Sequence, residues 1–417
     1  MLGRFELVLS FLVVSVSAWT PPHTLFDPLV ASKVYATAQK LSSPAKYPSI
    51  TSQSGVWKLS PVDTWTSGFF PATLYQLKKR ECLCPGSTRV KGSVPKWLQL
   101  GRSWSAGLVK LHWNNNQGHD VGFLSWPFAE DLDLSPNNGA AKTNVIDFAR
   151  ELASRYSPIV GATRSWNSPP NSTDFTLTGN RTFYDIAVKH ADTWLKNGVR
   201  RDWGTWHVVN FNSKTGAVSS KKTRQGYDAN STWARGQSWA IYSYARLFQY
   251  TGVERYLDAS RNLAAYFLRR AAENPGYLVW DFDAPRTKGI QQPADSSAAM
   301  VAAVALQLLA TAEKSVRNTT GANRWISHSQ KLISQTSSYA WSPHWQSLLS
   351  NGTRDNNGGG DPHARSKNTG LPYGDYFWVK SGNYILETLQ AKCPSGKSPK
   401  RLSCGSDLRG SSLAGSH

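Results

Sequence analysis

The residues with the clearest chemical potential are one carboxylate and the aromatic residues close to it. Asp120 follows His119 and precedes Gly122. A carboxyl group buried beside aromatic side chains has a raised proton affinity and can transfer a proton. The alternative is structural, because aspartate is also a common cap of helices and turns. The sequence therefore offers Asp120 as a candidate acid or base.

Arg235 and Trp239 form a second candidate pair. They are four residues apart in a stretch with helical periodicity, so their side chains share one helix face. The guanidinium could bind a carboxylate of a ligand, and the indole could stack on a sugar ring. A cation–π or core pair is the structural alternative, and the two residues alone slightly favour it.

The composition adds two broad indications. The chain has 18 Trp, and clustered Trp can line a sugar site, although an aromatic-rich core explains the number equally well. The formal net charge of +20 favours an acidic partner, such as an anionic polysaccharide, a nucleic acid or a membrane surface. The basic residues are spread along the chain, so a solvated basic surface is the alternative.

The N-terminus has the pattern of a secretory signal peptide. Arg4 precedes an apolar run from Leu7 to Val16, and small residues end at Ala18. Residues 1–18 are therefore predicted to be removed, which leaves a secreted, extracellular protein and makes nucleic acid a weak choice of partner. The run is too short for a stable membrane anchor, and no later stretch is expected to span a bilayer.

Other features fit the same compartment. Four cysteines could form two disulfides, whose pairing the sequence does not give: Cys82, Cys84, Cys393 and Cys404. Their spacing suits no metal site, and neither a metal nor an organic cofactor is expected. Sequons for N-glycosylation begin at Asn171, Asn180, Asn230, Asn318 and Asn351.

A repeated helical unit dominates the middle of the chain. Segments that start at Thr178 and Thr251 share Thr, Gly, Asp, Ala and Leu in register, and a fainter copy starts at Asp147. Such repetition predicts helical hairpins that stack side by side, in a closed ring or in an open solenoid.

Two further helices and one hairpin are predicted around this unit. One helix covers residues 231–251, with Ser231 and Thr232 as capping residues and Gly252 at its end. Residues 296–313 are rich in Ala and Leu and predict a helix that is buried on several sides. The best strand signal is residues 207–211, as part of a small hairpin.

Longer motifs resemble the unsaturated glucuronyl hydrolases of glycoside hydrolase family 88. They follow the family order over roughly residues 55 to 390, at 64–71, 118–123, 155–166, 207–212, 224–239, 280–285, 295–299 and 373–377. The resemblance implies an all-α fold, an (α/α)6 barrel of alternating inner and outer helices. The unsaturated rhamnogalacturonyl hydrolases share this fold, but residues 235–239 resemble the glucuronyl branch more.

The resemblance also implies a substrate and a reaction. The substrates are oligosaccharides left by polysaccharide lyases, with a 4,5-unsaturated uronic acid at the non-reducing end. An acidic side chain protonates C4 of the vinyl ether and water adds at C5. The resulting hemiketal opens and the glycosidic bond breaks, without direct acid attack on the glycosidic oxygen.

The site predicted on this basis has one catalytic and six binding residues. Asp120 corresponds to an active-site carboxylate that supports the main acid of the family. Substrate binding is assigned to Trp65, His119, His207, Gln225, Arg235 and Trp239. A lone His, Gln or Trp is otherwise more simply a structural group. Structural roles are assigned to Asp281, Asp283, Asp295 and Asp375, with Asp295 as a helix N-cap.

The chain departs from the family pattern between residues 157 and 177. This stretch contains three Pro and no helical period. Asp147 and Asp185 are about half as far apart as Asp185 and Asp258, the next equivalent pair of the repeat. In the family, a motif resembling residues 172–175 continues into a helix that carries the principal acid/base aspartate. About one inner helix, roughly 15–20 residues at ordinary helix length, is therefore predicted to be missing.

Neither neighbouring aspartate is a convincing substitute for that acid. Asp147 aligns with outer-helix residues of the repeat and is expected near the N-terminus of such a helix, where it would suit the dipole. Asp174 is nearest to the deletion, but no physical argument makes it catalytic.

The sequence thus predicts a signal peptide (1–18), a barrel domain (19–395) and a disordered tail (396–417). The predicted function is a glycoside hydrolase that removes unsaturated uronic acid, with little or no activity in the chain as written. The alternatives are a secreted carbohydrate-binding relative without catalysis, an unsaturated rhamnogalacturonyl hydrolase, and a basic protein that binds anionic glycans non-specifically. The source polysaccharide and the oligomeric state are not determined.

Overall fold

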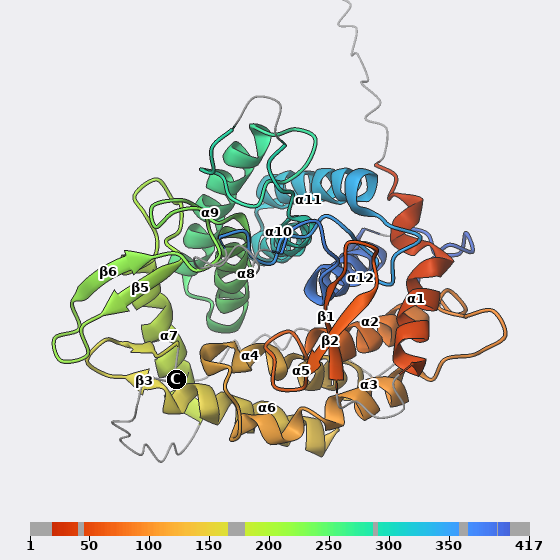
Figure 1. Ribbon diagram of the computed structural model, residues 1–417, viewed down its shortest axis with the longest axis horizontal. Helices are drawn as coiled ribbons and strands as arrows, with labels where there is room; N and C mark the ends of the chain where they lie inside the picture. The colour runs from red at the N-terminus through yellow and green to blue at the C-terminus, as the bar shows by residue number, and fades with distance from the viewer. Residues whose placement is uncertain are drawn as a thin grey trace, which may run out of the picture.

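The protein is mostly helical, with three two-stranded antiparallel sheets (Figure 1). The computed structural model describes residues 19–40, 46–165, 180–286, 291–357, 366–389 and 391–400. The sheets pair β1 (Lys46–Thr51) with β2 (Trp57–Pro61), β3 (Tyr156–Ser157) with β4 (Ala162–Thr163), and β5 (Val208–Phe211) with β6 (Val218–Lys222). The last pair confirms the hairpin predicted around residues 207–211.

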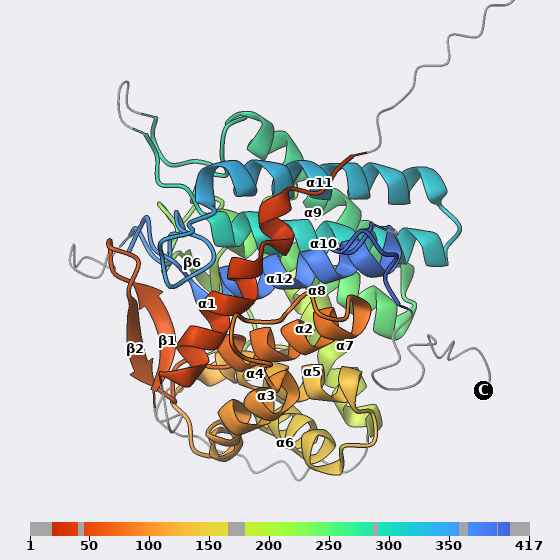
Figure 2. The same ribbon diagram turned by 90° about the vertical axis from the view of Figure 1, so that its right-hand side faces the viewer.

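Five inner helices hold the centre of the molecule. They are α2 (Phe69–Leu83), α5 (Trp126–Leu134), α8 (Ala234–Thr251), α10 (Ser296–Ser315) and α12 (Pro372–Thr388). Their mutual contacts follow the order α5, α2, α12, α10, α8. Helices from the two ends of the chain, α2 and α12, therefore lie side by side (Figures 1 and 2). A ring requires this contact and an open solenoid does not.

Six outer helices flank this centre. They are α1 (Pro28–Gln39), α3 (Trp97–Ala106), α6 (Gly139–Ser154), α7 (Asn180–Asn197), α9 (Glu254–Ala272) and α11 (Thr319–Ala340). Four short helices complete the described elements: η1 (His23–Phe26), η2 (Val109–His112), η3 (Gly118–Asp120) and α4 (Val121–Leu124). Along the chain each outer helix is followed by an inner one, except that the next described helix after α6 is α7.

The packing of α7 differs from that of its sequence repeat α9. In the described part of α7, residues 182–197, no side chain is buried. Phe183 and Trp194 remain partly accessible, whereas the equivalent Tyr256 and Phe267 of α9 are each 0% exposed. The two helices have the same apolar pattern, so the difference lies in what surrounds them. An apolar helix face normally packs on a neighbouring element.

The burial of α10 explains its composition. Its side chains are almost all buried, which confirms the prediction for the Ala- and Leu-rich stretch. By length and composition α10 could cross a membrane, but 89% of its apolar window is buried inside the molecule. It begins at Asp295, whose carboxylate accepts hydrogen bonds from the backbone N–H groups of Ser297 and Ala298. The predicted N-cap is confirmed.

Helix α8 begins later than predicted. Its first residue is Ala234, three positions after Ser231. Ser231 does not cap it, because its hydroxyl donates to Asp281 at 2.7 Å and so fixes the preceding loop. The predicted end is confirmed, since Gly252 closes the helix with a positive φ of 67° that suits glycine.

One disulfide ties the C-terminal segment to the centre. Cys84 follows α2 and bonds Cys393, with their Cα atoms 5.6 Å apart. The backbone N–H of Lys400 also donates to the Leu83 carbonyl at 2.8 Å. Cys404, the predicted signal peptide, Asn171 and Asp174 lie outside the described residues, as does most of the predicted tail. The predicted domain boundaries stay predictions.

Candidate functional site

Asp120 lies at a junction of two short helices. It ends η3 and directly precedes α4. The segment is fixed by the backbone N–H of His119, which donates to the Ser165 carbonyl at 2.8 Å. The Asp120 side chain is 29% exposed, and its Oδ1 lies 3.4 Å from Nε2 of His119. Burial raises the pKa of Asp120 above its usual range, and the charge of His119 acts against this rise. A partly accessible carboxyl group with raised proton affinity is suited to proton transfer.

An aromatic wall runs beside Asp120. Phe123, one helical turn after Asp120, contacts Trp65 at a centroid distance of 5.5 Å and Trp239 at 5.3 Å. Phe123 also stacks on Trp126 at 5.6 Å. Two of the residues predicted to bind sugar, Trp65 and Trp239, thus meet through one ring next to the candidate acid. Both remain partly accessible, as a sugar-stacking surface requires.

A second line of contacts leads from Trp65 to His207. Trp65 stacks on Tyr373 at 5.0 Å, and the guanidinium of Arg235 lies 5.1 Å from the Tyr373 ring. The same guanidinium lies 4.5 Å from the Trp233 ring, which stacks on His207 at 4.4 Å. These five residues form a continuous stack of rings around one cation. The stack joins loop, helix and hairpin residues that are far apart in the sequence.

Arg235 is completely enclosed in this stack. Its side chain is 0% exposed and pairs with the equally buried carboxylate of Asp295. It also donates from Nη1 to the Thr353 carbonyl at 2.6 Å and from Nη2 to the Arg354 carbonyl at 2.7 Å. Arg235 is therefore placed at the predicted site, but its guanidinium is engaged with protein groups. The predicted direct contact with substrate stays a prediction.

His207 is held as a neutral ring. Its Nδ1 accepts hydrogen bonds from the backbone N–H groups of Arg224 at 3.2 Å and Gln225 at 3.4 Å. Since these amides only donate, the ring proton is on Nε2. Burial lowers the pKa of His207 to about 3, and the charges of Arg235 and His119 lower it further.

The pKa of His207 predicts a loss of stability in acid. Below its usual pKa of about 6.5, the histidine of the unfolded chain takes up a proton. Folded His207 does not until the pH approaches about 3. The free energy of unfolding should therefore fall as the pH drops from about 6.5 towards 3. The substitution His207→Asn should reduce the loss between pH 7 and 5 by an amount on the order of 1 kcal/mol, measured by urea unfolding.

The control is His344→Asn, because His344 is exposed. It should leave the pH dependence unchanged. An identical pH dependence in wild type and His207→Asn would show that His207 ionises equally in both states.

Gln225 completes the group of predicted binding residues. Its Nε2 donates to the Arg354 carbonyl at 2.8 Å, and its own backbone carbonyl accepts from Nε1 of Trp280 at 2.8 Å. Gln225 and Arg235 thus contact the same carbonyl. Contacts connect five of the seven predicted residues, namely Trp65, His207, Gln225, Arg235 and Trp239. His119 and Asp120 pair with each other and precede Phe123 of this group in the chain.

The four aspartates assigned to structural roles make such contacts. Asp281 accepts from the Tyr227 N–H at 2.9 Å, and Asp283 accepts from the Thr232 N–H at 2.7 Å. Asp375 accepts from the N–H groups of Leu348 and Leu349 at 2.9 and 3.1 Å.

Asp147 lies in outer helix α6 as predicted, but in its middle and not near its N-terminus. There it pairs with Arg150 at 2.6 Å.

Three residues of the site were not singled out from the sequence. Trp233 and Tyr373 lie inside motifs that carry the resemblance, but only contact distances show that they sandwich Arg235. Phe123 links the two tryptophans in the same way. Their positions inside the motifs are the signal that could have found them. Their residue types alone are those of ordinary core side chains.

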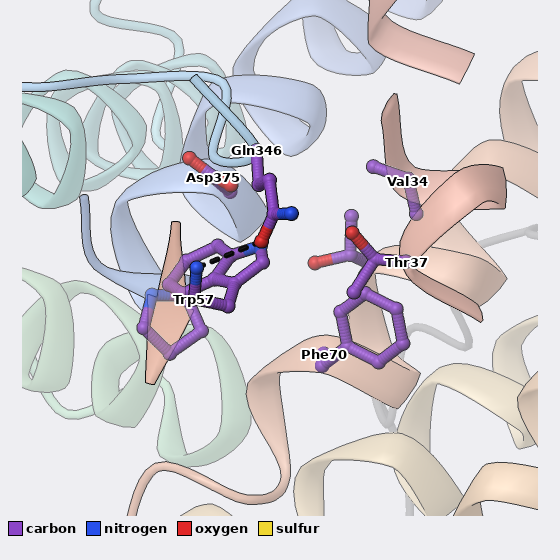
Figure 3. A pocket seen from close by; sticks show the side chains of 8 residues that line it. Val34, Thr37, Trp57, Phe70, Gln346 and Asp375 are labelled. Carbon is purple, nitrogen blue, oxygen red and sulfur yellow. Dashed lines mark hydrogen bonds between the residues drawn. The ribbon is translucent and has the colours of Figure 1, made fainter. Parts of the chain in front are cut away.

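A small pocket elsewhere does not belong to this site. It is lined by Val34, Thr37, Trp57, Phe70, Thr73, Gln346, Pro372 and Asp375 (Figure 3). On one side of it the Trp57 backbone N–H donates to Oε1 of Gln346 at 2.8 Å. It has room for about one water molecule and none for a sugar.

Comparisons with known proteins find relatives and similar structures. The chain is 32% identical over 265 residues to an unsaturated glucuronyl hydrolase of Formosa agariphila, in an alignment that covers 59% of this chain and 63% of that protein. It is 29% identical to an unsaturated chondroitin disaccharide hydrolase of Streptococcus pneumoniae, over 44% of this chain and 50% of that protein. The crystal structure of an unsaturated glucuronyl hydrolase from Bacillus sp. GL1 matches with a TM-score of 0.74 and 21% identity, over 88% of this chain and 96% of that one.

The chain is similar in sequence to unsaturated glucuronyl hydrolases and shares the fold of their solved structures. No family model matches it. A further structure of this family, an unsaturated glucuronyl hydrolase mutant from Streptococcus agalactiae complexed with dGlcA-GalNAc6S, matches with a TM-score of 0.64 and 21% identity, over 87% of this chain and 90% of that one. At these identities the structures establish the shared mostly helical fold. The aligned part spans less than two thirds of the Formosa unsaturated glucuronyl hydrolase, and half of the pneumococcal relative.

Within the described ranges, no group of three or more His, Cys, Asp or Glu side chains could hold a metal ion.

Proposed function

We propose that this protein is a glycoside hydrolase that removes a 4,5-unsaturated uronic acid from the non-reducing end of lyase-generated oligosaccharides. The observation that carries this proposal is the placement of Asp120. Its carboxyl group has a raised pKa and lies one helical turn from Phe123, which joins Trp65 and Trp239. An acid beside a partly open aromatic surface suits a flat, unsaturated sugar ring. The names of the relatives support the same substrate class.

The reaction would be a hydration of the C4=C5 double bond. A carboxyl group gives its proton to C4, and the oxygen of a water molecule bonds to C5 while its proton passes to a base. The hemiketal at C5 then opens by breaking its bond to the ring oxygen. The hemiacetal left at C1 releases the next sugar as an alcohol. In this scheme Asp120 is one of two acidic groups, and neutral His207 can hold the water or a sugar hydroxyl through Nε2–H.

The second acidic group is proposed to lie on an inner helix that this chain lacks. Three observations support its absence between α6 and α7. The alternation of outer and inner described helices breaks at this point. Residues 182–197 of α7 have no buried side chain, unlike the equivalent residues of α9. The spacing of the repeat is also about one helix short there.

The missing helix favours a second candidate function. A chain without its principal acid can still bind unsaturated oligosaccharides through the aromatic wall and the stack. Such a secreted carbohydrate-binding relative would have lost catalysis. A transcript that encodes the helix would favour the enzyme, and its absence would favour the binder.

Export is part of the same proposal. The disulfide between Cys84 and Cys393 supports an oxidising compartment, because such bonds persist outside the reducing cytosol. The predicted signal peptide at residues 1–18 would direct the chain there. Substrates made by extracellular lyases would then be within reach.

The test follows the near-ultraviolet absorbance of an unsaturated uronyl disaccharide, which hydration of the double bond removes. The chain as written should leave the absorbance almost unchanged. Insertion of the family helix between α6 and α7 should give a rapid loss, since general acid catalysis contributes about 10²- to 10⁴-fold. Rapid loss with the chain as written would show that no acid is missing. Absence of loss with the inserted helix would reject the hydrolase.

A further inference from the structure

The chain contains five sequons for N-glycosylation, and the structure describes the asparagine side chain of three of them: Asn230, Asn318 and Asn351. A glycan on the Nδ2 atom of asparagine is bulky and polar, so the folded protein must leave this atom open to solvent. The three amides differ in their exposure and in the groups that they bind. These differences indicate which sequon can carry a glycan in the folded chain.

Asn351 is enclosed by groups from two helices. Its Nδ2 donates to the carbonyl of Tyr339, near the end of α11, at 2.5 Å. Its backbone carbonyl accepts from the N–H of Ser296, the first residue of α10, at 3.0 Å. The residue is half-buried, and Thr353, the third residue of the sequon, is 0% exposed. A glycan on this amide would crowd the end of α11.

Asn318 is engaged as the N-cap of α11. Its Oδ1 accepts from the Gly321 N–H at 3.0 Å, and its Nδ2 donates to Oε2 of Glu313 at 2.9 Å. The Glu313 side chain is 1% exposed and also pairs with Arg261. A Cβ atom at Gly321 would lie 2.5 Å from Nδ2, so there is little free space around this amide. A glycan here would disturb both the cap and a buried carboxylate.

Asn230 differs from both, because its side chain is exposed in a turn that precedes α8. The Ser231 N–H donates to the Asp228 carbonyl at 3.1 Å, and the Asn230 N–H donates to Oδ1 of Asp228 at 2.9 Å. The Asn230 carbonyl accepts from Nη1 of Arg200 at 3.2 Å. Among the described residues, the side-chain amide of Asn230 has no hydrogen-bond partner. The backbone of the turn is therefore fixed, while the amide is available to solvent.

The other two residues of this sequon are bound into the fold. The Ser231 hydroxyl donates to Asp281 at 2.7 Å, and the hydroxyls of Thr232 and Tyr266 are hydrogen-bonded at 2.8 Å. Thr232 is 0% exposed. Because the sequon requires the hydroxyl of its third residue, the glycan has to be attached before this loop folds. Folding then buries Thr232 and leaves the Asn230 amide outside, so an attached glycan does not obstruct it.

We propose that the secreted chain carries an N-linked glycan at Asn230, and that Asn318 and Asn351 are unmodified. The proposal rests on the export that forms part of the proposed function, because N-glycans are attached in the secretory pathway. The glycan would stand on the loop that leads to Trp233 of the stack and to α8. Chains with a glycan at Asn318 or Asn351 would lose a cap or a half-buried hydrogen bond, and they would be depleted from the secreted protein.

The experiment expresses the full chain, with its own signal peptide, in a eukaryotic secretory host and analyses the protein in the medium. Peptide N-glycosidase F in heavy-oxygen water converts each glycosylated asparagine into a labelled aspartate, and mass spectrometry of peptides measures each sequon separately. We expect the label at Asn230 in most molecules, and no label at Asn318 or Asn351. Asn230→Gln should remove this label and increase the electrophoretic mobility of the untreated protein.

Asn318→Gln and Asn351→Gln are the matched controls, because each removes another sequon by the same substitution. Neither should change the mobility of the secreted protein. Enzymatic removal of the glycan from wild type should leave the midpoint of thermal unfolding nearly unchanged, since the Asn230 amide has no partner among the described residues. Label at Asn318 or Asn351 to the same extent as at Asn230 would overturn the structural argument.

Failure of export gives a different result from failure of the modification. A chain that stays inside the cells and carries no glycan would overturn the proposed export, and the glycan at Asn230 with it. A chain recovered from the medium with Asn230 unmodified would leave export standing and overturn the modification alone.

Discussion

Replacing Asp120 by asparagine in a chain that carries the inserted helix should abolish the loss of near-ultraviolet absorbance from unsaturated disaccharides. Asparagine has nearly the same size and can still accept a hydrogen bond, but it has no acidic proton and no charge. The expected reduction in kcat is about 10²- to 10⁴-fold, the usual contribution of a positioned acid or base. Binding should weaken only modestly, because Trp65 and Trp239 keep their positions against Phe123.

The matched control is Asp147→Asn. Asp147 is also an aspartate near the deletion, but it lies on outer helix α6 and pairs with Arg150. It should leave kcat unchanged. Unchanged turnover in Asp120→Asn would remove Asp120 from the chemistry, and a large loss in Asp147→Asn would show that the wrong carboxylate was chosen.

The second large effect is expected on stability, from the buried pair of Arg235 and Asp295. Asp295→Ala leaves the fully buried guanidinium without its counter-charge and removes the N-cap of α10. The free energy of unfolding should fall by about 3–5 kcal/mol, the usual cost of breaking a buried pair by removing one partner. Urea unfolding at neutral pH would measure it.

Two comparisons separate the buried charge from other causes. Asp258→Ala breaks an ion pair with Arg261 in which the Asp258 side chain is 52% exposed, and it should cost no more than about 1 kcal/mol. Replacing both buried partners, Arg235→Met with Asp295→Leu, should cost less than Asp295→Ala, because no charge is then left unpaired. If Asp295→Ala costs no more than Asp258→Ala, the pair does not stabilise the fold as its burial indicates.

The helices of the fold follow closely from the sequence. The repeat places α7 and α9, and the Ala- and Leu-rich stretch gives buried α10 with Asp295 as its cap. These features are local, since they depend on periodicity and on hydrogen bonds between neighbours. The predicted start of α8 was wrong because it depends on a contact that is not local. Ser231 has the right chemistry for a cap, but a tertiary contact with Asp281 takes its hydroxyl.

The contact between the first and last inner helices could not be predicted from the pattern. Apolar periodicity says that a helix face is covered, but not by which partner. The contact between α2 and α12 joins segments separated by most of the chain, and only packing reveals it. The accessible face of α7 could not be predicted from the pattern either. Its sequence predicts a buried face, and the structure describes none in residues 182–197.

The sequence by itself determined the helical class and the repeat, because periodicity and residue type are local properties. The interruption after residue 157 and the candidate residues around Asp120 were predicted from the spacing of the repeat and from the motifs that resemble the family. Only the tertiary structure decided how these side chains are buried and paired. Arg235 has no partner that the sequence reveals, but in the structure its guanidinium is buried against Asp295 and donates from its Nη atoms to the carbonyls of Thr353 and Arg354. These partners are remote in the chain, so the burial and pairing of Arg235 depend on the tertiary structure.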